Sequence, residues 1–290
     1  MTDTTNVDQN AQPQPAAAMP PAPGQMPQPG APQSKQKMIL IAIAVVALIA
    51  GAIYFTTGGK VSKEDYRKGV DVGNSVIPDA SGSIADLNKI MYVSSLNSET
   101  SIKNDIDDAK DSLAKYKDAN KKLADIAALK DKEVKEKYDA YMSKFKSYTE
   151  FTDAYITSAQ KVLPALAECN DFNRSYISSD GAKYKAEVTT CKDAIDAVSG
   201  VKDKDLSKLL TDYKESLKKV SDLTDEYVAI PTSDYMKMSA TRTSITEETR
   251  KMRDFISDAN SNLTKRSKDV SPRDAFNAFG ELMEDKQREK

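Results

Sequence analysis

Residues 134–169 read VKEKYDAYMSKFKSYTEFTDAYITSAQKVLPALAEC, and this stretch decides the fold class. Its apolar side chains recur every three or four residues, which places them on one face of an α-helix. Charged residues fill many of the positions between them, so the opposite face suits water. The pattern predicts a long amphipathic helix in a coiled-coil-like bundle. The apolar face comprises Val134, Tyr138, Tyr141, Phe145, Tyr148, Tyr155, Ala159, Val162, Leu166 and Cys169.

The same spacing continues before and after this stretch, which extends the predicted bundle over residues 99–268. Lysine, aspartate, alanine and serine occur throughout, a composition that favours helix over sheet. We therefore predict an all-α fold, an elongated antiparallel bundle made of two αα-hairpins. The supporting positions are Ile102, Ile106, Ala109, Leu113, Tyr116, Leu123, Ala127, Tyr184, Val188, Cys191, Ile195, Val198, Leu206, Leu210, Tyr213, Leu217, Val220, Tyr227, Met238, Ile245, Met252, Ile256, Ala259 and Leu263.

A shift of 72 residues aligns residues 129–156 with residues 201–228 without a gap. Eight of the 28 positions are identical, and apolar positions pair with apolar ones. We interpret this match as a duplicated αα-hairpin, although chance similarity between helices rich in lysine and aspartate is the alternative. The identical pairs are Lys130/Lys202, Asp131/Asp203, Lys132/Lys204, Tyr141/Tyr213, Lys146/Lys218, Thr152/Thr224, Asp153/Asp225 and Tyr155/Tyr227.

Glycine, proline and serine mark the expected helix boundaries. Ser199-Gly200 is a helix C-terminus signal, and the aligned point of the first copy predicts a turn near Lys130-Asp131. Pro78 followed by Ser81-Gly82 predicts short juxtamembrane helices over residues 58–98.

Proline also marks the later boundaries. Pro164 is expected to kink or end its helix, and the run Ile230-Pro231-Thr232-Ser233 interrupts a long helical pattern. Ser271-Pro272 predicts the start of an amphipathic C-terminal helix within residues 269–290, with Ser271 as its N-cap. This last helix is expected to dock on its own bundle.

An uncharged apolar run, MILIAIAVVALIAGAIYF at residues 38–55, precedes the bundle. It spans roughly 27 Å as a helix, close to the thickness of a bilayer core. We predict a single transmembrane helix over residues 38–57. A cleavable signal peptide is the alternative because Ala50-Gly51-Ala52 fits the small-residue pattern, but the 37 residues ahead of the run favour an anchor.

Residues 1–37 are rich in proline, glutamine and alanine and lack aromatic side chains. Such a segment buries too little apolar surface to offset the entropy of ordering, so we predict a disordered tail. A partner that recognises proline-rich peptides is the alternative.

The chain has two cysteines, Cys169 and Cys191, on inward positions of their helical stripes. An even count at this spacing predicts a disulfide formed in an oxidising compartment, with two buried thiols as the alternative. The positive charges favour the opposite conclusion, a bundle in the cytoplasm, because more lysine and arginine residues follow the apolar run than precede it. We give the cysteines more weight and place the N-terminus in the cytoplasm and the bundle outside.

Composition narrows the function. The 42 basic and 44 acidic side chains are mixed along the chain, and no basic stripe points to nucleic acid. Histidine is absent, which removes the commonest general base and a common zinc ligand. We therefore predict no enzyme activity, no catalytic residues, no metal and no cofactor.

Four weak patterns in the sequence each have an ordinary structural explanation beside a functional one. Asp171, Asn173 and Ser175 resemble the start of a calcium loop, but Tyr176 stands where glycine is needed. Two further patterns fit solvated helix faces better than catalytic or cation sites. They are the Ser-x-x-Lys pairs Ser112/Lys115, Ser143/Lys146, Ser158/Lys161 and Ser216/Lys219, and the aspartate cluster Asp105, Asp107, Asp108 and Asp111. The abundant tyrosines are expected in the core or at its rim, with a ligand site as the alternative.

We expect a non-enzymatic, membrane-anchored interaction or scaffold module of the cell envelope. It is held by residues 38–57, stiffened by Cys169 and Cys191, and expected to bind a protein partner in the envelope. The alternative is a sensory or ligand-binding module that captures a small molecule or an ion between its helices.

Overall fold

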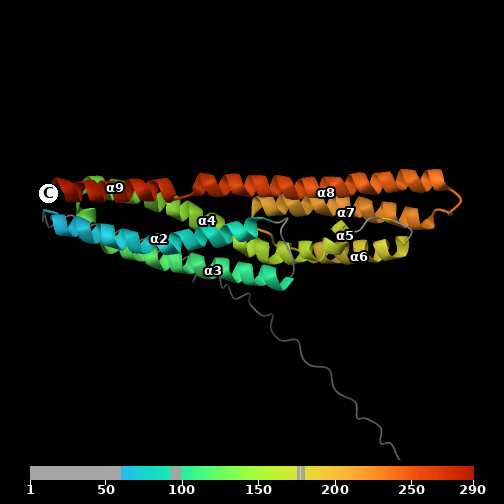
Figure 1. The fold of residues 1–290 in the computed structure, drawn as a ribbon, viewed down its shortest axis with the longest axis horizontal. Helices are drawn as coiled ribbons and strands as arrows, with labels where there is room; N and C mark the ends of the chain where they lie inside the picture. Colours follow the sequence, from blue (N-terminus) through green and yellow to red (C-terminus); the bar gives the residue numbers. More distant parts are fainter. Residues whose placement is uncertain (1–59, 93–98, 175–176, 178–179) are drawn as a thin grey trace, which may run out of the picture. The chain divides into compact units, whose positions relative to one another are not determined.

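The computed structural model describes residues 60–92, 99–174, 177 and 180–290 (Figure 1). Helices make up 89% of these residues and none of them forms a strand, which confirms the all-α prediction. The chain divides into two compact units, Met1–Thr57 and Gly58–Lys290. The predicted tail and transmembrane helix lie outside the described residues. Within the described part, no helix is both long and apolar enough to cross a bilayer.

The second unit consists of long helices joined by short connections. Its elements, in chain order, are α2 (Lys63–Met91), α3 (Glu99–Lys121), η2 (Lys122–Asp125), η3 (Ala127–Lys130), α4 (Lys132–Ala167), α5 (Asn170–Arg174), α6 (Gly181–Ala197), α7 (Lys204–Ala229), α8 (Tyr235–Val270) and α9 (Arg273–Glu289).

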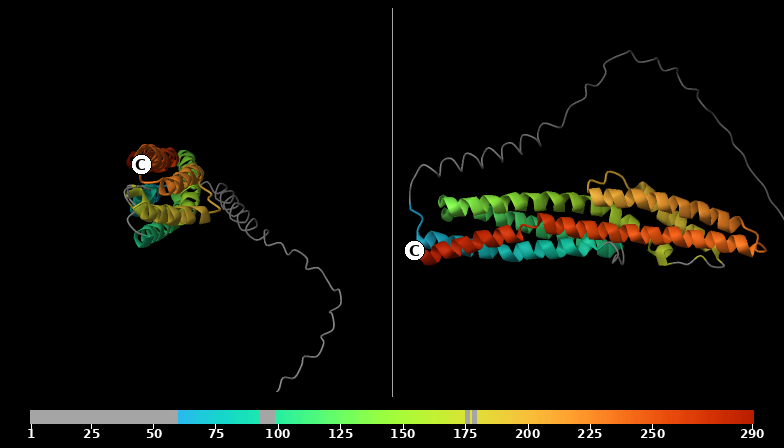
Figure 2. Two further views of the ribbon diagram at one scale, coloured as in Figure 1. Left: turned by 90° about the vertical axis from the view of Figure 1, so that its right-hand side faces the viewer. Right: turned by 90° about the horizontal axis from the view of Figure 1, so that it is seen from above.

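Two groups of four helices follow one another along this unit. The basal group contains α2, α3, α9 and the N-terminal part of α4, and the distal group contains the C-terminal part of α4 with α6, α7 and α8. Helix α4, of 36 residues and roughly 54 Å, therefore belongs to both. Helices α8 and α9 lie nearly in line and cover one side of both groups (Figure 2).

The sequence prediction for residues 58–98 is wrong, because α2 is one helix of 29 residues that continues through Pro78. Proline removes one backbone donor and leaves a carbonyl without its partner. Pro78 and the residue four positions earlier, Asn74, are both exposed, so water can bond that carbonyl. Helix α2 packs against α3 and α9 and buries Tyr66, Val76 and Leu87. The bundle therefore begins at α2 rather than at residue 99.

Helix α9 also belongs to the bundle rather than following it. Phe279 and Met283 are fully buried where α9 packs on α2 and α4. This confirms that the amphipathic C-terminal segment docks on its own bundle. The helix begins at Arg273 with Pro272 as its N-cap, one residue later than predicted.

Most of the predicted turns are confirmed. Asp131 is the N-cap of α4, and its side chain accepts hydrogen bonds from two backbone N–H groups of the first turn. Gly200 has φ 64° between α6 and α7, a conformation that glycine adopts without strain. Helix α7 ends at Ala229, just before Pro231. Pro164 lies inside α4, which ends one turn later at Ala167.

Tyrosine hydroxyls fix the register between α2 and α4, which run in the same direction. Tyr155 donates to the carbonyl oxygen of Ile90 at 2.6 Å, and Tyr148 shares a 3.1 Å hydrogen bond with Ser83. Both pairs are separated by 65 residues, as is the hydrogen bond from Tyr66 to Asp131. Tyrosine is long enough to cross this core while giving its polar end a partner, which explains why the stripe is rich in it.

Replacing Tyr155 with phenylalanine is expected to lower the free energy of unfolding by about 1 kcal/mol, because the buried Ile90 carbonyl loses its donor. Urea denaturation of the two proteins measures this difference. Tyr235→Phe is the control, since Tyr235 is exposed and its change should stay within about 0.5 kcal/mol. Equal stability of Tyr155→Phe and the parent chain would argue against the register role of this hydroxyl.

Candidate functional site

The turn between α7 and α8 is fixed at both ends by its own sequence. Ile230 is buried and caps α7, and Pro231 cannot continue the helix because it lacks a backbone donor. Asp234 is the N-cap of α8, where its side chain accepts a hydrogen bond from the backbone N–H of Lys237 at 3.1 Å. The turn is therefore a defined structure at the end of two long helices.

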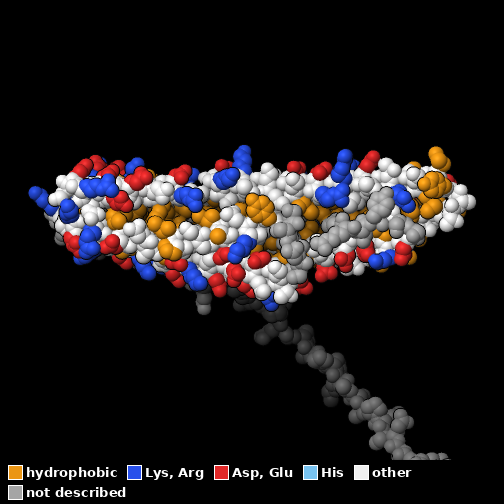
Figure 3. All heavy atoms as spheres, in the orientation of Figure 1, with side chains coloured by type: hydrophobic (Ala, Val, Ile, Leu, Met, Phe, Trp, Pro, Cys, Tyr) orange, Lys and Arg blue, Asp and Glu red, His pale blue; other side chains and the backbone are white. Residues whose placement is uncertain are grey.

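Large apolar side chains on either side of this turn, at the end of α7 and the start of α8, project into solvent. Val228 is 46% exposed, Tyr235 76% and Met236 80%, and we call these three residues the apolar tip. The turn lies at the far end of the distal group, opposite the start of α2 (Figure 1). Apolar side chains are visible on the surface at that end (Figure 3).

Ion pairs flank the apolar tip. Lys237 of α8 pairs with Glu226 of α7 at 3.2 Å, and Lys185 of α6 pairs with Asp225 of α7 at 2.7 Å. These pairs are exposed and contribute little stability, but they surround the apolar side chains with a polar rim. An apolar centre with a polar rim is the usual build of a protein-binding surface.

The two cysteines predicted to pair are joined by a disulfide with a Cα–Cα distance of 4.5 Å. Both are fully buried, as their inward positions in the helical stripes predicted. The bond fastens the end of α4 to the middle of α6, on the two sides of the segment that contains α5. This position makes it a structural link within the distal group.

The tyrosines of the bundle faces are directed to the core. Tyr116 and Tyr141 share a hydrogen bond at 3.3 Å, and Tyr141 donates to the side-chain oxygen of Asn120. Burial raises the pKa of Tyr116 and that of Tyr138 to about 12, so both hydroxyls are neutral near pH 7. The residues of this set are all buried: Tyr138, Tyr141, Tyr148, Tyr155, Tyr213 and Tyr227.

Several members of the Ser-x-x-Lys pairs and of the aspartate cluster make local hydrogen bonds or ion pairs. The Ser158 hydroxyl accepts from the backbone N–H groups of Lys202 and Asp203, so it serves the start of α7. The Ser112 hydroxyl donates to the carbonyl of Ala109, and Lys110 pairs with Asp107 at 3.2 Å. These groups behave as helix-surface and capping residues.

The calcium-loop pattern is described only in part. Asp171 is exposed in the short helix α5, whereas Ser175 and Tyr176 lie outside the described residues. Among the residues that are described, no cluster of three or more acidic or cysteine side chains is arranged to hold a metal ion.

One residue cluster of the core escaped sequence reasoning. The carboxylate of Asp203 caps α7 and also pairs with Arg266 of α8 at 2.9 Å, with its side chain fully buried. Arg266 pairs with Asp205 as well and lies 4.8 Å from the centre of the Phe151 ring. The identical aligned pair Asp131/Asp203 is a signal that could have indicated the N-cap of α7. No sequence pattern pointed to a cation 63 residues away.

Three of the hollows on the described surface differ in their lining residues. One of about 410 Å³ lies between α4 and α6, and its lining includes Lys161, Pro164 and Glu168. A smaller one of about 160 Å³ lies between α2 and α9, and its lining includes Ile77 and Phe276. A further hollow of about 410 Å³ includes Tyr92, Thr264 and Lys268 in its lining, so a tyrosine lines one of these three hollows.

Comparison of the chain with models of protein families, with curated proteins and with solved structures found no match.

Proposed function

We propose that this chain is a non-enzymatic, membrane-anchored module that presents its apolar tip to a protein partner in the cell envelope. The observation on which the proposal depends is the exposure of Tyr235 and Met236 on a turn whose backbone is held by Ile230 and Asp234. Exposed aromatic and methionine side chains that lie together mark interaction sites more often than isolated surface residues do.

The predicted anchor sets the position of the apolar tip relative to the membrane. Residues 38–57 would hold the chain in the membrane, and the second unit begins at Gly58, immediately after this segment. Helix α2 starts at the basal end, so the tip is at the end of the unit away from the anchor's attachment. The disulfide supports an oxidising, extracytoplasmic location for the bundle, with the N-terminus in the cytoplasm.

A photo-crosslinking amino acid at position 235 of the full chain tests the proposal in the cells that produce it. We expect one discrete adduct whose second component is identified by mass spectrometry as an envelope protein. Adding Met236→Glu should reduce this adduct several-fold, because a charge in an apolar contact must be desolvated. The thermal stability of this variant should equal that of the parent chain, since Met236 is 80% exposed.

The matched control places the same crosslinker at Lys208, which is exposed on the side of α7. We expect no adduct from position 208. An adduct of twice the chain's own mass would show that a second copy occupies the tip. That result, or the absence of any protein adduct from position 235, would reject a heterologous partner at this site.

We also infer that residues 129–156 and 201–228 arose by duplication. The aligned residues Asp131 and Asp203 are both N-caps, and Thr152 and Thr224 both donate to the carbonyl four positions earlier. The aligned acids Glu133 and Asp205 both pair with a cation from a later helix.

These pairings support the duplication in three dimensions as well. Lys286 of α9 serves the first copy and Arg266 of α8 serves the second. Sequences of homologous chains test the inference: if the two segments are no more alike in them than unrelated helices, the duplication is rejected.

A further inference from the structure

One of the three hollows differs from the other two in its chemistry. It lies beside the C-terminal part of α8, at the end of α2, and its volume of about 410 Å³ is typical of small-molecule sites. Its described lining combines hydroxyl, amide, phenol and ammonium groups, whereas glutamate lines each of the other two. We call it the α8 hollow. Its lining residues are Tyr92, Asn260, Ser261, Thr264, Lys265 and Lys268.

The five lining residues of α8 share one face of that helix. Positions 260, 264 and 268 are about one turn apart, and positions 261 and 265 lie beside them. Ala259 and Leu263 of the same helix are buried in the core, so this polar face is turned away from the core. Three of the five side chains are exposed and two are partly covered. The face therefore offers five polar groups to a ligand in the hollow.

Tyr92 adds an aromatic ring from α2, where it is the C-cap residue. Ile90 and Met91 just before it are buried, but Tyr92 is 55% exposed. Every other described tyrosine outside the apolar tip is buried in the core. An exposed tyrosine offers an apolar ring face for stacking and a hydroxyl for hydrogen bonding.

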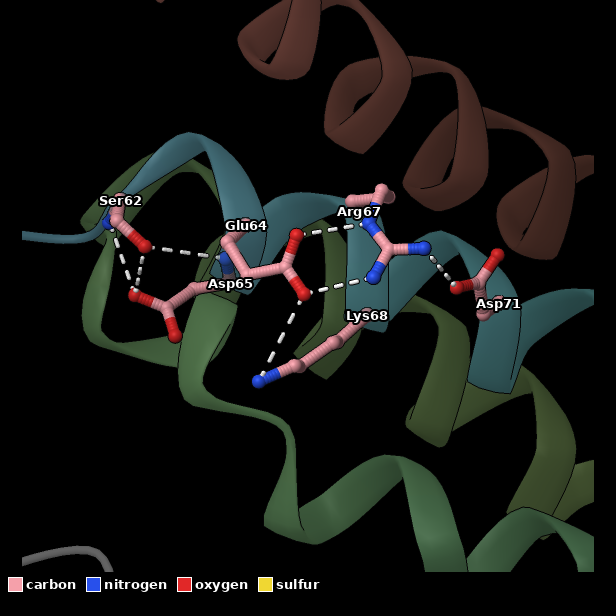
Figure 4. Close-up of polar contacts among 6 residues, drawn as sticks. All are labelled: Ser62, Glu64, Asp65, Arg67, Lys68 and Asp71. Carbon is pink, nitrogen blue, oxygen red and sulfur yellow. Dashed lines mark hydrogen bonds and ion pairs between the residues drawn. The ribbon is translucent and has the colours of Figure 1, made fainter.

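The two charged residues in the described lining are both cations. Lys265 and Lys268 are three positions apart, so they are neighbours on the helix surface. Neither has an ion-pair or hydrogen-bond partner within the described part of the chain. Cations elsewhere on the surface often lie beside carboxylates, as Arg67 does with Glu64 and Asp71 (Figure 4). The lining of the α8 hollow is therefore positively charged, which suits an anionic ligand.

We propose that the α8 hollow binds an anionic saccharide, a sugar that carries a carboxylate or a phosphate. A sugar ring has apolar C–H groups on its faces, which suit the ring of Tyr92. Its hydroxyls suit groups that both donate and accept hydrogen bonds, such as those of Asn260 and Thr264. Lys265 and Lys268 would hold the anionic group through charge-assisted hydrogen bonds. The inference depends neither on the apolar tip nor on the membrane anchor.

Isothermal titration calorimetry on the full chain tests this site. The chain is kept at low salt in a detergent without sugar groups and is titrated with trigalacturonic acid and, separately, with glucose phosphate. We expect saturable binding of at least one of them, and the one that binds identifies the anionic group. Maltotriose, which is neutral, and triglutamate, which has no sugar ring, should each bind at least about tenfold more weakly.

Paired lysine variants separate binding in the hollow from general charge. Lys265→Gln with Lys268→Gln should weaken the binding of the anionic sugar at least about tenfold, because its charge loses both partners. Lys68→Gln with Lys121→Gln removes the same charge from exposed, ion-paired lysines of α2 and α3. This control pair should leave the affinity unchanged.

Tyrosine variants test the stacking contact in the same way. Tyr92→Ala should weaken binding several-fold, because the sugar loses the ring against which it packs. Tyr235→Ala removes an exposed tyrosine at the apolar tip and should have no effect on sugar binding. Circular dichroism should show the same helix content in both variants as in the parent chain.

The outcomes keep this inference separate from the proposed function. The absence of saturable binding for both anionic sugars would overturn it, and so would triglutamate or maltotriose binding as tightly as they do. An equal loss of affinity in the two paired lysine variants would also overturn it, because overall charge would then account for the binding. None of these results would change the crosslink expected from position 235.

Discussion

Replacing Asp203 with alanine is expected to lower the free energy of unfolding by about 3 kcal/mol. Two effects add at this residue. The backbone N–H groups of Asp205 and Leu206 lose the side-chain oxygen that caps α7. Arg266, which is only 25% exposed, loses one of its two carboxylate partners in a core where its charge is poorly solvated. Urea denaturation followed by circular dichroism measures the change.

The aligned residue Asp131 provides the matched control. It caps α4 in the same way, but its side chain is 19% exposed and Lys286 lies 3.7 Å away rather than in close contact. Asp131 also accepts a hydrogen bond from the hydroxyl of the buried Tyr66, so the control is made in the Tyr66→Phe background. In that background we expect Asp131→Ala to cost about half as much as Asp203→Ala, because water can solvate the Lys286 ammonium that is left behind. Equal losses at the two positions would show that the cap alone, and not the buried ion pair, accounts for the effect.

Replacing both cysteines with alanine is expected to lower the free energy of unfolding by about 3 kcal/mol. The bond closes a loop of 22 residues, and removing it restores conformational freedom to the unfolded chain. Both sulfur atoms are buried, so alanine also leaves small cavities that add to the loss.

Two measurements separate these causes. The parent chain unfolded in the presence of a reductant should lose the loop-closure share alone, so it should lie between the oxidised chain and the double variant. If the oxidised and reduced parent chains unfold at the same denaturant concentration, the disulfide has no part in stabilising the distal group.

The helices of the bundle were predictable because their burial pattern has the period of the α-helix. The stripe from Val134 to Cys169 predicted α4 and also the buried positions of both cysteines. The boundary at Pro78 was wrong because the carbonyl that this proline frees lies on the exposed side of α2, where water can bond it. Whether that carbonyl faces water depends on which side of α2 is packed, and local sequence does not encode this.

The candidate site was less predictable than the fold. The turn at Pro231 was expected, but Tyr235 and Met236 look like ordinary apolar residues at the start of a helical pattern. Their exposure depends on which side of the first turn of α8 faces α7, and local sequence does not encode this. Partner choice for Arg266 and the convergence of segments around Asp131 likewise depend on tertiary packing between distant elements.

Helix α4 runs without interruption from one group of four helices into the other. If the chain were divided at the middle of α4, each group would lose part of one of its four helices and expose apolar core surface. Neither group should therefore fold on its own. The two groups of helices should therefore unfold together, in one cooperative transition rather than in two.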